Sequence, residues 1–238
     1  MKKLFIGLAF LLYHLSSFAQ DQMVMDEHAS VRELNEKFNK IAISQNIKLI
    51  ISQGNDIALA VSASQEKYKD NIKTEVKNGT LNIYSGGDSR WSSKAQNLTV
   101  YLSFKEIESI EASGASDVIV LGVLNLKKIN IGLSGASKLR ASFKVEVLMM
   151  DLSGACKANM QGNVVQLNIE CSGASDVNGY KLEAEKANVN ASGASDIMIT
   201  VTKELNAEAS GASHIYYKGN ATVTNVREGG VSKILHTQ

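Results

Sequence analysis

The sequence predicts an all-β protein: a parallel β-helix of about six to seven short rungs, preceded by a β-rich N-terminal meander that packs on or continues the coil. Three observations lead to this fold class. The tetrapeptide Ser-Gly-Ala-Ser, intact or degenerate, occurs seven times at intervals of 18 to 21 residues. Apolar and polar residues alternate between its copies, as they do in strands. Proline, which cannot donate a hydrogen bond to a sheet, is absent from all 238 residues.

The first element is an export signal, predicted over residues 1–19. A basic pair is followed by an apolar stretch, Leu4 to Leu15, which is too short to span a bilayer comfortably. Small residues then predict cleavage after Ala19; an uncleaved N-terminal anchor is the alternative. We therefore expect an exported protein in the periplasm, at the cell surface or outside the cell. Residues 20–37 form an N-terminal extension, and nothing later in the chain resembles a membrane helix.

Residues 38–104 are predicted to form an antiparallel meander, because four segments alternate apolar and polar residues at a period of two. Asn78-Gly79 stands between two of these segments and predicts a two-residue hairpin turn, since both residues tolerate a positive φ. Ser64 to Asn71 is the one stretch here that suggests a short helical turn.

The repeats occupy residues 105–238 and can be stacked by aligning each tetrapeptide. The column two positions after each word is mostly apolar, as in Val118 and Leu139. The column three positions before it is apolar as well, as in Ile110 and Ile131. Each repeat therefore consists of two short strands, and it buries its apolar side only by stacking on its neighbours.

The glycine of each word is placed where the chain turns from one sheet of the coil to the other. Neighbouring rungs lie about 4.8 Å apart, so a bulky side chain at the turn would meet its own copies above and below. Glycine also gives the backbone the freedom that the bend needs, and serine hydroxyls can satisfy backbone groups at the corner. The predicted corner glycines are Gly114, Gly135, Gly154, Gly173, Gly193, Gly211 and Gly230. The fold thus explains the repeated word without a catalytic serine.

The two cysteines, Cys156 and Cys171, fall in different columns of the aligned repeats. Export would permit a disulfide, but the repeat register places them at non-equivalent positions. We expect two buried thiols.

The repeated word Ser-Gly-Ala-Ser-Asp-[Val/Ile] follows a β-rich segment that contains Thr-Glu-Val-Lys-Asn-Gly-Thr-Leu-Asn-Ile-Tyr. Together they resemble the putative auto-transporter adhesin, head GIN domain family, found as exported proteins of Bacteroidetes. The resemblance covers about Phe38 to Leu235, so residues 38–238 are expected to form one continuous domain. It implies a right-handed parallel β-helix, and the adhesin role is attached to the family by analogy of fold.

The column directly after each word is the strongest candidate for chemistry. Asp176 and Asp196 fall on adjacent rungs, about 5 Å apart, and paired carboxylates at that range could raise one pKa enough to make a general acid. β-Helix enzymes that cleave acidic polysaccharides use clustered aspartates in this way. Lys157 precedes the pair and His214 follows it, so a solvated ladder of mixed sign is the simpler interpretation. The lysine also disfavours a calcium site.

Other polar features have structural interpretations as well. A column rich in asparagine, four residues before each word, can form an amide ladder. An acidic stripe that includes Asp151 and Glu170 could attract a divalent cation, although a hydrated acidic face is the simpler reading. Trp91 could be a surface platform for stacking a sugar, or it could pack its loop against the end of the coil.

Composition and motifs narrow the function further. With 25 basic and 24 acidic residues the chain has a net charge of +1, so no electrostatic attraction to nucleic acid is expected. No Cys/His spacing suggests zinc, and no glycine-rich loop has the lysine that phosphate binding requires. We assign no catalytic, cofactor-binding or metal-ligating residue and expect no cofactor.

Three functional hypotheses follow. The first is an exported, non-enzymatic, adhesin-like binding or structural module that uses flat outer faces to contact a cell-surface polysaccharide or an envelope protein. The second is a polysaccharide lyase or hydrolase that uses Asp176 and Asp196. The third is a self-assembling envelope component that pairs with copies of itself through its last rung, Gly229 to Leu235, or through the edges of the N-terminal meander.

Overall fold

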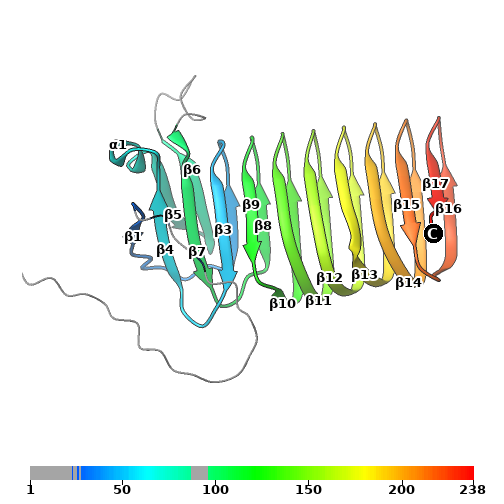
Figure 1. The fold of residues 1–238 in the computed structure, drawn as a ribbon, viewed down its shortest axis with the longest axis horizontal. Coiled ribbons are helices and arrows are strands. Elements are labelled where there is room, and N and C mark those ends of the chain that lie inside the picture. The colour runs from blue at the N-terminus through cyan, green and yellow to red at the C-terminus, as the bar shows by residue number, and fades with distance from the viewer. Residues whose placement is uncertain (1–22, 24–25, 27, 87–95) are drawn as a thin grey trace, which may run out of the picture.

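The protein is an elongated stack of β-rungs, as predicted (Figure 1). The computed structural model describes residues 23, 26, 28–86 and 96–238. Among these residues it forms a β-solenoid of about seven turns with a single short helix. The predicted signal peptide and Trp91 lie outside the described residues.

The repeats form the long, regular part of the coil. We call the residues directly after each corner word the leading face, and those directly before it the trailing face. Each of β11 to β14 begins on the leading face, bends once and ends on the trailing face, and each pairs in parallel with the next. The strands of this part are β8 (Ser109–Ala112), β9 (Asp117–Leu121), β10 (Leu124–Leu133), β11 (Lys138–Leu152), β12 (Lys157–Cys171), β13 (Asp176–Ala191), β14 (Asp196–Ala209), β15 (His214–Lys218), β16 (Thr222–Glu228) and β17 (Lys233–His236).

The N-terminal part continues this coil, and here the prediction of an antiparallel meander is largely wrong. The elements are β1 (Ser30–Arg32), β2 (Lys40–Ile43), β3 (Lys48–Gln53), β4 (Ala58–Ser62), α1 (Glu66–Lys69), β5 (Ile72–Lys77), β6 (Thr80–Ser85) and β7 (Thr99–Phe104). β2 pairs in parallel with both β6 and β8, and β3 pairs in parallel with both β7 and β9. The rung made of β2 and β3 is therefore inserted between two rungs that come later in the chain. Alternation at a period of two is the same in parallel and antiparallel strands, so it could not reveal this pairing.

Antiparallel strands close the N-terminal end of the coil. β5 pairs with β6, β4 pairs with β7 and β1 pairs with β4, all antiparallel. Asn78 and Gly79 turn the β5–β6 hairpin with φ of 51° and 73°, which confirms the predicted turn. The predicted helical turn is α1. Leu59 and Ile72 of these strands are at most 1% exposed, so the cap covers the first rungs of the core.

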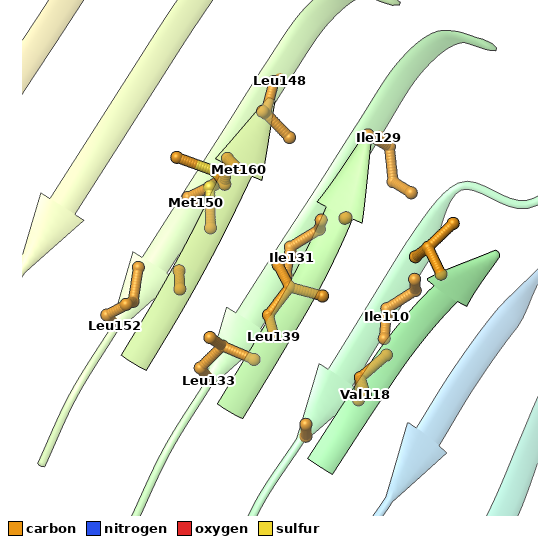
Figure 2. Close-up of a cluster of buried hydrophobic side chains, with 14 of the residues drawn as sticks. Ile110, Val118, Ile129, Ile131, Leu133, Leu139, Leu148, Met150, Leu152 and Met160 are labelled. Carbon is orange, nitrogen blue, oxygen red and sulfur yellow. The ribbon is translucent and has the colours of Figure 1, made fainter. Parts of the chain in front are cut away.

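The core runs along the coil as columns of inward side chains (Figure 2). Ile131 packs in register with Ile110 and Met150 on the trailing face, and Leu139 with Val118 on the leading face. All five are at most 1% exposed, which confirms the predicted columns. Burial of apolar surface, worth about 25 cal/mol per Å², is what holds successive rungs together.

Candidate functional site

The corner glycines are positioned by contact between rungs as well as by the bend. Gly173 has a φ of 79°, and a Cβ atom there would lie 2.5 Å from the carbonyl oxygen of Gly154 on the preceding rung. The next residue, Ala174, donates its backbone N–H to that same oxygen at 2.7 Å. A side chain at Gly173 would therefore push apart the backbones that this hydrogen bond joins. All seven predicted corner glycines have a positive φ.

The last serine of each word is a structural residue. Ser195 is fully buried, and its hydroxyl donates to the carbonyl of Ser192, three residues earlier, at 3.0 Å. Cys156 takes this position in the degenerate word, and its thiol donates to the carbonyl of Ser153 at 3.2 Å. A hydroxyl held this way satisfies a corner carbonyl. In the part of the chain that the structure describes, no histidine, lysine or carboxylate side chain forms a hydrogen bond to it, as a base that activates a nucleophile would.

The outward column after each word brings together the acidic and basic residues that the sequence singled out. Asp176 and Asp196 are register neighbours on β13 and β14. Lys157 Nζ lies 3.9 Å from Asp176, and His214 Nδ1 lies 3.0 Å from an oxygen of Asp196. The side chain of Asp176 is 45% exposed and that of Asp196 is 54% exposed. Each carboxylate thus has a basic neighbour on the side away from the other carboxylate, and each remains in contact with solvent. This arrangement is the predicted surface ladder of mixed charge.

The described surface also has an open groove that runs along the coil beside the corners. We call it the corner trough. Its main section has a volume of about 670 Å³ and crosses five rungs, a length of about 19 Å at about 4.8 Å per step. One wall is the outward column of the trailing face, and the other is the first residue of each word, which is serine except in the last. The residues of the two walls are Asp151, Glu170, Asn190, Glu208 and Arg227, and Ser153, Ser172, Ser192, Ser210 and Gly229.

The trough continues toward the N-terminal end as a hollow of about 380 Å³. Glu111 and Ser113 line this section. Between the two sections the acidic column is interrupted by Gly132. A Cβ atom at Gly132 would collide with the carboxylate of Glu111, so this carboxylate fills the space that the missing side chain leaves.

Charge is concentrated in the middle of the trough. Asp151 and Glu170 are register neighbours on β11 and β12, and within residues 28–86 and 96–238 neither forms an ion pair. Near the C-terminal end of the trough, by contrast, the charged residues Arg227 and Glu208 form an ion pair at 2.8 Å. Among the residues described, no three His, Cys, Asp or Glu side chains come together as metal ligands would, and two carboxylates fall short of the six to eight oxygens that calcium takes.

The floor of the trough is the inward column between the two walls, and its three middle residues are small: Cys171, Ala191 and Ala209. Both cysteines are buried and unpaired, as predicted. Burial raises the pKa of the Cys171 thiol to about 12, and nearby Cys156 and Asp151 add to the effect. Burial also raises the pKa of Cys156. Both thiols are therefore protonated at neutral pH and are not nucleophiles.

Sequence reasoning identified one wall of the trough and missed the other. The acidic stripe was visible as a column, whereas the first serines were assigned only to the corner. The signal was present: the residue between the two walls is small in several repeats, such as Ala191 and Ala209. A small floor between two outward columns leaves a groove. The asparagine column forms amide hydrogen bonds from Asn188 to Asn168 and from Asn225 to Asn206.

Stacked parallel rungs, glycine corners and a polar groove along the outside define a β-solenoid that presents a repeated surface. The chain belongs to the family described as putative auto-transporter adhesin, head GIN domain, which it matches over residues 37–221. No curated protein matches the sequence.

Solved structures share the fold at low sequence identity. A putative adhesin from Bacteroides fragilis is 19% identical, with a TM-score of 0.78 over 89% of this chain and 98% of that one. A putative adhesin from Parabacteroides distasonis is 17% identical, with a TM-score of 0.70 over 88% and 96%. A putative lipid binding protein from the same species is 18% identical, with a TM-score of 0.67 over 90% and 98%. The described part of this chain has no helix with the length and hydrophobicity to cross a bilayer.

Proposed function

We propose that this chain is an exported, non-enzymatic, adhesin-like module of the cell envelope that binds its partner along the outside of the coil. The observation that carries the proposal is the corner trough, where the same two columns of polar side chains recur from rung to rung. A partner that also repeats would meet similar groups at every step, and many weak contacts then add up. The proposal places the protein in the periplasm, at the cell surface or outside the cell, after cleavage near Ala19.

The chemistry of the trough favours a cell-surface polysaccharide as the partner, with an envelope protein as the alternative. Carboxylate, amide and hydroxyl oxygens accept hydrogen bonds from sugar hydroxyls, and an open groove admits a chain at any point along its length. The interior of the coil is filled: Leu148, Leu167 and Val189 are fully buried in the core. Binding on the outside therefore fits this chain better than enclosure of a lipid.

The surroundings of the reactive groups support a role without catalysis. Asp176 and Asp196 are about half exposed and each has a basic neighbour, and the Cys171 thiol keeps its proton. A surface ladder of mixed charge accounts for these two carboxylates without a catalytic role.

The test is a binding measurement on immobilised polysaccharide fractions from the envelope. Glu170→Lys reverses a charge in the middle of the trough, and Glu36→Lys makes the same change at an exposed loop position outside it. We expect the Glu170 variant to bind about tenfold more weakly or worse and the Glu36 variant to bind like the unaltered chain. Equal binding by all three proteins would contradict a role for the trough.

The same fractions should be analysed for cleavage. We expect no new chain ends from the unaltered protein. Cleavage that Asp176→Asn and Asp196→Asn abolish would replace the binding module by the enzyme hypothesis.

A further inference from the structure

The two ends of the coil differ. At the N-terminal end, antiparallel strands and α1 cover the core. At the other end, and within residues 28–86 and 96–238, β16 pairs with β14 alone and β17 pairs with β15 alone. The last rung therefore presents the free edges of both of its strands.

Apolar side chains are exposed on this rung. Val226 is 47% exposed, although its column equivalents Ile169, Val189 and Ala207 are at most 1% exposed. Four of the large apolar residues that are exposed in the described structure lie between residues 223 and 235: Val223, Val226, Val231 and Leu235. Val223 and Val226 continue the inward columns of the buried Leu205 and Ala207, so the core is open to solvent along β16.

The backbone of the last rung directs hydrogen-bonding groups toward the open end beside these side chains. Gly229 and Lys233 donate their N–H groups to the preceding rung. Because successive residues of a strand direct their backbone groups to opposite neighbours, those of Val226 and Ile234 point to the open end. Each of these two residues therefore combines an inward apolar side chain with an N–H and a C=O that face outward along the coil axis.

We propose that β16 and β17 form a pairing surface for a second copy of this chain, and that two copies join tail to tail about a two-fold axis. Val226 of one copy faces Val226 of the other, and Ile234 faces Ile234, each pair exchanging two backbone hydrogen bonds in antiparallel register. The two cores then become continuous. Because the contact uses the same surface of both copies, the assembly closes as a dimer and does not grow into a fibre.

Glu228 sets the strength of this contact. It lies in the inward column that holds Ala191 and Ala209 on the two preceding rungs, and its carboxylate accepts the N–H of Ile234 at 2.5 Å. An inward-pointing charge is a known protection of a sheet edge. The carboxylate must release this N–H before the second copy can bond to it, so the dimer is in equilibrium with the monomer. The inference does not depend on the proposed function.

Sedimentation of the purified chain from micromolar to millimolar concentration tests the proposal. Val226→Lys places a charge in the interface, and Val165→Lys is its matched control, since Val165 is 46% exposed in the middle of the coil. We expect a concentration-dependent dimer from the unaltered chain and the Val165 variant, and a monomer from the Val226 variant. Glu228→Ala should lower the dissociation constant about tenfold or more. Circular dichroism reports whether each variant folds.

A cross-linking experiment fixes the geometry. Val226→Cys places two Cα atoms about 5.5 Å apart across the axis, within the range of a disulfide, so mild oxidation should give covalent dimers. Val165→Cys should give none, and the native thiols are buried. A monomeric unaltered chain, dimerisation of the Val226→Lys variant, loss of the dimer in both lysine variants, or failure of V226C to cross-link would each overturn the tail-to-tail dimer.

Discussion

Replacing a corner glycine with alanine should destabilise the coil by more than the bend alone explains. At Gly173 the new Cβ would lie 2.5 Å from the carbonyl oxygen and 2.9 Å from the nitrogen of Gly154. Both are backbone atoms, so the two rungs must separate by about an ångström to restore ordinary contact. That movement lengthens the 2.7 Å hydrogen bond from Ala174 to Gly154, worth about 1 kcal/mol.

Gly122 provides the matched control, because its φ of 72° resembles the 79° of Gly173 while a Cβ atom there would meet no atom of the described residues within 4 Å. Alanine in this left-handed conformation costs about 1–2 kcal/mol at either position. We expect Gly122→Ala to lose about that much, and Gly173→Ala to lose about 2 kcal/mol more from the strained contact and the weakened hydrogen bond.

Denaturant unfolding followed by far-ultraviolet circular dichroism measures the difference, as a lower midpoint for the Gly173 variant. Equal midpoints for the two variants would refute the reasoning, since the glycine would then be required only for its φ and not for the close stacking of the rungs.

Three further predictions concern the buried thiols and the charged ladder. Cys156→Ser restores the hydroxyl of the other words and should raise the free energy of unfolding by about 0.5–1 kcal/mol, seen as a higher denaturant midpoint; a lower midpoint would contradict the structural role of that hydroxyl. The pKa of Cys171, raised to about 12 in the fold from 9.0, means that the unfolded chain loses this proton first as the pH rises. Stability from this thiol is therefore complete below pH 9 and declines between about pH 9 and 12, and Cys171→Ala should flatten that decline in unfolding curves recorded across the range. Asp176→Asn and Asp196→Asn should each change the free energy of unfolding by less than about 1 kcal/mol; a larger loss would show that the ladder stabilises the coil.

The regular coil could be predicted because its geometry repeats in the sequence. Copies of a corner that recur every 18 to 21 residues stack on one another. The repeated word therefore sets the period of the coil and the inward columns on either side of it, such as the column of Ile131 and Met150. The same logic identified Gly173 and the other corner glycines, and the Asn78-Gly79 hairpin followed from local turn chemistry alone.

The inserted rung could not be predicted, because its corner carries no copy of the word. Between β2 and β3 the chain turns at Gln45 and Asn46, with φ of 65° and 59°, and Gln45 lies beneath Gly114 in the stack. Asparagine tolerates this conformation, whereas glutamine gives no sequence signal for it. The pairing of β2 with β6 and β8 is a long-range contact, and strand periodicity does not specify partners.

The corner trough could be predicted only in part, because its width depends on the distance between its two walls. The sequence shows that Glu170 is outward and that Ser172 lies at a corner, but the width of the space between them depends on how the chain bends. The sequence shows the order of the charges along a column. It does not show that Asp151 and Glu170 lack an ion-pair partner among the described residues, because that depends on which side chains pack beside them.

The placement of β2 and β3 between later strands has a consequence for how the protein folds. In a simple solenoid every turn touches only adjacent turns, so folding can start anywhere and spread along the stack. Here Leu49 pairs with both Val100 and Val118, so the first turn waits for chain that is synthesised some fifty to seventy residues later. We therefore expect the N-terminal region to fold slowly and cooperatively, as the nucleus of the structure. Each following turn should then fold in sequence on the turn before it.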